Sequence, residues 1–175
     1  MKEQVIIPKA KVKKAASSKN RQTPLMVAVE KTPDVKGHCK VGLSALKGNR
    51  EKVKASDTRK LFSSIDIDSA VKTICPNDSR WDYAIEYGNE VYFLEVHPGS
   101  TSNIVEVLKK LSWLKNWLTT RAPQINALKA TSKSPYYWTY TNNFNVLKSS
   151  RQYRAMLQSG LVLIKTMNQI GRAHV

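Results

Sequence analysis

The sequence has no long hydrophobic run and little cysteine, and each shortage excludes a class of protein. The longest apolar run near its end covers residues 161–164, far short of the roughly 20 residues of a transmembrane helix. Residues 5–7 are apolar but too few for the core of a secretory signal. The two cysteines, Cys39 and Cys75, do not suggest a disulfide scaffold. We therefore expect an intracellular, cytoplasmic protein with no membrane partner.

Several common catalytic motifs are missing as well. The sequence contains no glycine-rich phosphate loop, no Cys/His quartet spaced for zinc and no arrangement of serine, histidine and aspartate typical of hydrolases. Because of these absences, we expect nucleotide triphosphatases, zinc-binding domains and serine hydrolases much less than other classes of function.

Acidic residues are scarce and unevenly placed. The chain has 29 Lys and Arg against 13 Asp and Glu, a net charge of +16. No acid follows Glu106, and those of the second half lie between Asp66 and Glu106. A strongly basic surface attracts polyanions, nucleic acid first. A carboxylate metal site inside a phosphate-attracting surface produces this distribution, and so does chance.

Composition divides the chain into an arm and one domain. Residues 1–22 are rich in Lys, Ser and Ala, which predicts disorder. Such an arm either binds nucleic acid or is a solvated tail. Residues 23–175 are the right length for a single domain with its own core.

The middle of the chain predicts a β-hairpin. Residues 81–87 and 90–96 are rich in aromatic and β-branched residues, and Gly88–Asn89 between them is a two-residue turn signal. Residues 61–68 predict a strand or a short helix capped by Asp66 or Asp68, and residues 76–79 a turn. Residues 24–29 predict a strand or a packing segment.

Beyond the hairpin the apolar period changes to that of a helix. Residues 102–118 carry an apolar stripe, and Asn103 with Glu106 fits a capping box at its start. A strand is expected at 136–140, a helix from Ser149 or Ser150 to Gly160, and a last strand at 161–164. The expected fold is α/β, with a mixed central sheet flanked by helices.

A two-residue hairpin turn fixes which side chains are neighbours. Glu86 then faces Val91, Ala84 faces Phe93, and Asp82 faces Glu95. His97 lies on the same face as Glu95, and Arg80 would oppose it.

Two opposed carboxylates repel each other and need a cation between them. Mg²⁺ or Mn²⁺ would supply it, because both ions prefer hard oxygen ligands. The structural alternative is that Asp82 caps a turn while Glu95 pairs with Arg80 at a sheet edge. Glu95 lies between the apolar residues Leu94 and Val96. This favours the metal interpretation, because burying a carboxylate costs free energy unless it has a partner.

The spacing from Asp82 to the segment Glu95-Val96-His97 resembles the signature of the PD-(D/E)XK, or restriction-endonuclease-like, nucleases. The likeness covers about residues 60–145, and the predicted order of hairpin, helix and strand agrees with it. It departs from the signature at Trp81, which replaces the proline, and at His97, which replaces the lysine.

The resemblance implies a metal-dependent nuclease that cuts DNA, or less readily RNA. Asp82 and Glu95 would bind the metal, with the main-chain carbonyl of Val96 as a further ligand and Asp68 as a possible additional acid. His97 would position or deprotonate water. We expect contacts with nucleic acid from Arg80, Lys109, Lys110, Arg151 and Arg154, and a homodimer is possible. As a lysine recruited from the helix, Lys109 or Lys110 is discounted, because both are expected to project away from the sheet.

Two rival functions stay open. His97 in the place of lysine favours a catalytically inactive nuclease fold that binds nucleic acid without cutting it. The other rival is a basic adaptor that binds RNA or protein and whose acids are structural.

Overall fold

The fold is built around a β-hairpin, as predicted. A computed structural model describes residues 22–170, so the expected arm lies outside the described residues except for its last residue. Strands β4 (Tyr83–Tyr87) and β5 (Glu90–His97) pair antiparallel, with Ala84 opposite Phe93 and Glu86 opposite Val91. Gly88 takes the turn with φ 63°, a conformation open to glycine. The predicted register is therefore confirmed.

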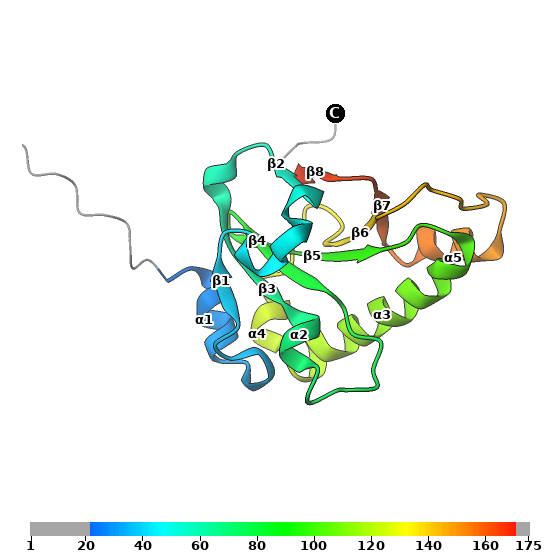
Figure 1. Cartoon of the computed structure of the whole chain (residues 1–175). Helices are drawn as coiled ribbons and strands as arrows, with labels where there is room; N and C mark the ends of the chain where they lie inside the picture. Colours follow the sequence, from blue (N-terminus) through cyan, green and yellow to red (C-terminus); the bar gives the residue numbers. More distant parts are fainter. Residues whose placement is uncertain (1–21, 171–175) are drawn as a thin grey trace, which may run out of the picture.

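This hairpin lies in the middle of a mixed six-stranded sheet (Figure 1). The strand order is β1-β3-β4-β5-β6-β7, in which β5, β6 and β7 are parallel and the other neighbouring pairs are antiparallel. The outer strands of this sheet are β1 (Cys39–Val41), β3 (Leu61–Asp66), β6 (Tyr136–Tyr140) and β7 (Val162–Ile164). The expected strands at 136–140 and 161–164 are thus confirmed to within a residue.

Helices cover one face of the sheet. They are α1 (Pro24–Glu30), α2 (Ile67–Val71), α3 (Thr101–Thr120), α4 (Pro123–Asn126) and α5 (Arg151–Gln158) (Figure 1). Ile104, Val107, Leu111 and Leu114 of α3 are buried in the same cluster as Phe93 of the sheet. The larger core therefore lies between the sheet and these helices, and the expected α/β fold with flanking helices is observed.

The opposite face carries a smaller core. It is covered by the 3₁₀ segment η2 (Ser44–Lys52) and by a parallel pair of short strands, β2 (Val53–Ala55) and β8 (Met167–Ile170). Leu46 and Met167 pack there against Ile85 and Leu94 of the hairpin. Two further 3₁₀ turns, η1 (Pro33–Val35) and η3 (Thr58–Lys60), lie in the connections.

Residues 24–29 form helix α1, so the expected strand was wrong there. Pro24 occupies the first turn, where its missing N–H costs nothing. Thr23 caps the helix, and the carboxylate of Glu86, distant in sequence, accepts the N–H of Leu25 at 3.2 Å. This end of the helix is thus held by tertiary contacts that a local pattern does not contain.

The ends of three other helices refine the expectations. Asp66 ends β3 and also caps α2, so the strand and the capped helix are both present. Ser150 caps α5, and Gly160, at φ 80°, follows its end. The cap of α3 is Ser100, whose hydroxyl accepts from the N–H of Asn103 at 3.4 Å, so the expected capping box beginning at Asn103 was wrong.

Candidate active site

Asp82 and Glu95 meet at one edge of the sheet, as the hairpin register predicts. The main-chain N–H of Asp82 donates to Glu95 Oε2 at 3.1 Å, and the N–H of Val96 donates to Asp82 Oδ2 at 3.0 Å. The Glu95 carboxylate thus binds the main chain of Asp82, and the Asp82 carboxylate binds the main chain of the residue that follows Glu95. The last paired residues of the β4–β5 ladder are Tyr83 and Leu94. The hydrogen bonds of the two carboxylates join the strands one residue beyond that pair.

Lys110 of helix α3 bridges the two carboxylates. Its Nζ lies 3.3 Å from Asp82 Oδ1 and in direct contact with Glu95 Oε1. The expectation that Lys110 projects away from the sheet was therefore wrong. Lys110 follows Val107 by three residues and precedes Leu114 by four, so it belongs to the buried stripe of the helix. That spacing is a signal in the sequence that could have identified it.

Burial governs the protonation of this triad. Glu95 has no exposed surface, and the side chains of Lys110 and Asp82 are 16% and 19% exposed. Burial, followed by the charge of Asp82, raises the pKa of Glu95 to about 8. Burial also raises the pKa of Asp82, against the lowering effects of Lys110 and the Val96 N–H. Near neutral pH the carboxyl group of Glu95, with a pKa of about 8, is therefore mostly protonated.

Lys110 keeps its charge in this setting. Burial lowers the pKa of Lys110, but attraction to Glu95 and Asp82 outweighs burial and raises that pKa above its ordinary value. The ammonium group is thus a fixed cation placed against two acids.

A second buried glutamate on the same sheet face provides a contrast. Glu86, 1% exposed, accepts hydrogen bonds from the hydroxyls of Thr23 and Ser63 and from the N–H of Leu25. Its partners are neutral groups that fasten helix α1 to the sheet. Glu95 instead has a cation and a second carboxylate, so the two glutamates serve different purposes.

The side chain of Arg80 lies away from Glu95. Arg80 Nε donates to Asp68 Oδ1 at 2.8 Å, and its Nη1 donates to the carbonyls of Cys75 and Pro76. Arg80 therefore holds the turn before β4, and pairing between Glu95 and Arg80 at a sheet edge is contradicted. Nor does Arg80 lie opposite His97, because the ladder ends at Tyr83.

Asp68 lies near the triad but outside it. Its carboxylate binds Arg80, while its charge is close enough to contribute, after burial, to the raised pKa of Asp82. His97 is half-buried at the end of β5, and its Nδ1 lies 3.5 Å from the carbonyl of Pro98. Among the described side chains, no hydrogen bond joins the His97 ring to Asp82, Glu95 or Lys110.

The remaining basic candidates lie on helices beside this edge. Lys109 on α3 and Arg151 and Arg154 on α5 are exposed. Lys109 is the immediate neighbour of Lys110, so one turn of α3 presents one lysine to the acids and another to solvent.

The donor set of the triad suits a hard divalent cation. Asp82 Oδ1 and Glu95 Oε1 already share one cation, the Lys110 ammonium. An extended residue directs its N–H and C=O to the same neighbour, so the Val96 carbonyl lies on the side of Asp82, as the Val96 N–H does.

Across residues 22–170, no group of three His, Cys, Asp or Glu side chains gathers closely enough to hold a metal alone. A metal here would complete its shell with water and phosphate oxygens, as Mg²⁺ commonly does. Asp82, Glu95 and the Val96 carbonyl are thus chemically suited to hold such an ion.

No helix among the described residues is both long and apolar enough to cross a bilayer.

Comparisons with protein-family profiles, with curated protein sequences and with solved structures found no significant match.

Proposed function

We propose that this protein is a divalent-metal-dependent nuclease with a restriction-endonuclease-like core, acting on DNA in preference to RNA. The observation that carries the proposal is the buried triad of Asp82, Glu95 and Lys110, two acids and one lysine at one edge of the sheet. The net charge of +16 supports a polyanionic substrate.

The order of elements around the triad supports the same proposal. The acids come from the hairpin β4–β5, the next helix is α3, and β6 then pairs parallel to β5. The resemblance places a lysine two residues after the second acid, where this chain has His97. In our proposal Lys110 of α3 replaces that lysine, and His97 has the lesser role of orienting water.

Each residue of the triad has a distinct task. Asp82, Glu95 and the Val96 carbonyl would hold Mg²⁺ or Mn²⁺, which lowers the pKa of a water and polarises the phosphodiester. Lys110 supplies a preorganised positive charge for the charge that develops on the phosphate. Glu95 must release its proton to bind a cation, so we expect cleavage to decrease as pH is lowered.

The decisive experiment is a cleavage assay on linear, circular and single-stranded DNA and on RNA, in Mg²⁺, Mn²⁺ or EDTA. Glu95→Gln and Lys110→Met should each reduce cleavage by about a hundredfold or more, the loss typical when one electrostatic catalytic group is removed. Glu86→Gln, at a buried glutamate on the same sheet face, is the matched control and should cut nucleic acid at close to the wild-type rate.

Two results would contradict the proposal. Cleavage that continues in EDTA would show that the reaction needs no metal. Cleavage unaffected by Glu95→Gln would show that the triad is not the catalytic site. Circular dichroism and thermal unfolding of each variant separate a lost site from a lost fold.

The ion pair of Lys110 with Asp82 and Glu95 also favours a second function, a catalytically inactive module that binds nucleic acid. A lysine that already balances the acids leaves less need for a metal. This alternative predicts salt-sensitive binding in EDTA, no cleavage of any substrate, and no stabilisation of the wild type by Mn²⁺. A basic adaptor with structural acids would additionally bind nucleic acid no better than other polyanions.

A further inference from the structure

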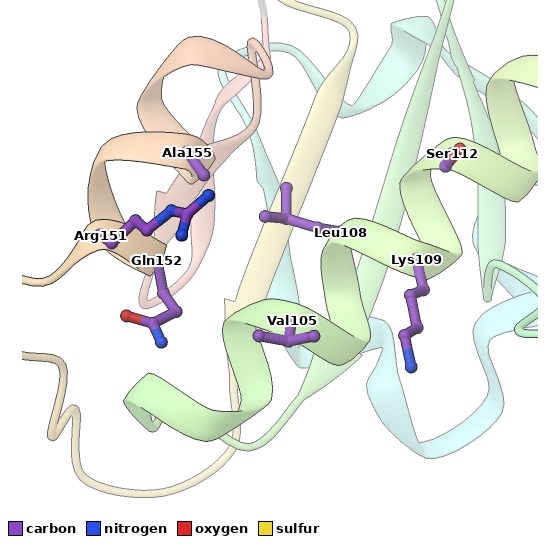
Figure 2. A pocket seen from close by; sticks show the side chains of 7 residues that line it. All are labelled: Val105, Leu108, Lys109, Ser112, Arg151, Gln152 and Ala155. Atoms are coloured by element: carbon purple, nitrogen blue, oxygen red, sulfur yellow. The ribbon is translucent and has the colours of Figure 1, made fainter.

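Helices α3 and α5 form a groove of about 480 Å³ (Figure 2). Its apolar lining comes from Val105 and Leu108 of α3 and Ala155 of α5, and its polar lining includes Lys109 and Arg151. Figure 2 shows Arg151 extending from α5 toward Leu108 across the space between the helices. A cavity of this size is within the range that holds small ligands or a short stretch of a polymer.

The charge of the groove has one sign. None of its lining residues is acidic, α5 has two arginines and no acid, and the sequence has no acid after Glu106. Within residues 22–170, neither Lys109 nor Arg151 forms an ion pair. Two exposed cations without counterions beside an apolar surface are complementary to a polyanion that also has apolar faces.

The groove and the triad share helix α3. Lys109 lines the groove, and the next residue, Lys110, contacts Asp82 and Glu95. Successive residues of an α-helix lie 1.5 Å apart along its axis. They are also turned by about 100° about that axis, so Lys109 and Lys110 point to different sides of α3, and a strand in the groove would lie along the helix that carries Lys110.

We propose that the α3–α5 groove binds a single-stranded segment of the nucleic acid substrate. Lys109 and Arg151 contact its phosphates, while bases lie against Val105, Leu108 and the guanidinium plane of Arg151. Contacts with phosphates and with the faces of bases do not read base edges, so this binding is tolerant of base sequence. The proposal rests on the proposed function for its ligand, but binding is measurable without cleavage.

The test measures binding of a short fluorescent oligothymidylate to the full chain in EDTA over a range of salt concentrations. The double variant Lys109→Gln/Arg151→Gln should weaken binding about tenfold at moderate salt. It should also reduce the slope of log K against log salt by about 1.4, since each phosphate contact of a single strand contributes about 0.7. The matched control is the double variant Lys148→Gln/Arg154→Gln, which removes the same charge but spares both cations of the groove.

A smaller loss in the control than in the groove variant supports the proposal. Equal losses would show that only net charge matters, and unchanged binding in the groove variant would show that the groove is not used. If the groove variant lost duplex binding but kept oligothymidylate binding, the proposed ligand would be wrong. Because oligothymidylate binding is measured in EDTA and without cleavage, failure of the proposed nuclease activity and failure of the proposed groove are distinguishable.

Discussion

Glu95 couples the folding of this protein to pH. Its pKa is about 8 in the folded chain, against an ordinary value of 4.5. Between these values the folded state binds a proton that the unfolded state has released, so the free energy of unfolding falls as pH rises. The free energy of unfolding begins to fall above about pH 4.5 and stops falling above about pH 8. Because one pKa unit corresponds to about 1.4 kcal/mol, the total is on the order of a few kcal/mol.

Glu95→Gln should remove most of this pH dependence. Glutamine resembles the protonated acid and does not ionise, so its free energy of unfolding should change less with pH than that of the wild type. Urea denaturation at several pH values between 5 and 9, in EDTA, measures both curves. Parallel curves for wild type and Glu95→Gln would show that Glu95 titrates normally.

At the scale of elements, the connection that leads into α3 passes very close to Tyr140 and Phe144 at Gly99. A Cβ there would lie 2.8 Å from Tyr140 Cβ and 3.3 Å from Phe144 Cδ2. The Gly99 N–H donates to Asn142 Oδ1, and its carbonyl accepts the N–H of Asn145, both at 2.9 Å. The connection from β5 to α3 is therefore packed directly against the segment after β6, and this packing helps to set the position of the helix that carries Lys110.

Gly99→Ala should destabilise the protein by about 1–3 kcal/mol, the usual cost of overpacking. It should also reduce cleavage in proportion to any displacement of α3. Thermal and urea unfolding measure the first effect. Gly48→Ala is the matched control, because no atom lies within 4 Å of its added Cβ, and it should change stability by about 0.5 kcal/mol or less. An equal loss in both variants would refute the close-approach explanation.

At the scale of the whole molecule, charge is segregated. The net charge is +16, yet four acids lie close together in the sheet-edge region, in the order Asp66, Asp68, Asp82 and Glu95. All four form ion pairs: Asp66 with Lys47, Asp68 with Arg80, and both Asp82 and Glu95 with Lys110. The described part of the molecule thus has a group of acids, compensated by three cations, within a chain of net positive charge.

Binding of nucleic acid should depend steeply on salt, because each phosphate neutralised on duplex DNA contributes about 0.9 to the slope of log K against log salt. The arm outside the described residues is tested by glutamine replacements of Lys9, Lys11, Lys13 and Lys14 together. If the arm binds nucleic acid, fluorescence anisotropy should give a slope smaller by about 3.6, or about 0.9 for each of the four lysines. If it is a solvated tail, the slope should stay close to that of the wild type. Binding that does not change with salt would contradict a phosphate-directed interaction altogether.

Local patterns in the sequence determined the hairpin and its register. Gly88–Asn89 allows only a tight turn, and a two-residue turn with period-two side chains places Asp82 beside Glu95. The apolar period of α3 and the aromatic run of β6 were equally local, and both elements are found at the expected residues to within two positions. These features depend on residues close together in the chain, so they can be read without the rest of the fold.

The tertiary structure alone decided what surrounds the acids. Glu86 fastens the first turn of α1 from 61 residues away, a contact that the local pattern does not contain. Lys110 lies on the buried stripe of α3, but that stripe does not reveal which strand it meets. Only the packing of α3 across β5 brings its ammonium to Asp82 and Glu95, 28 and 15 residues away. Periodicity indicates which face of an element is buried, whereas the partner on that face is chosen by how the elements pack.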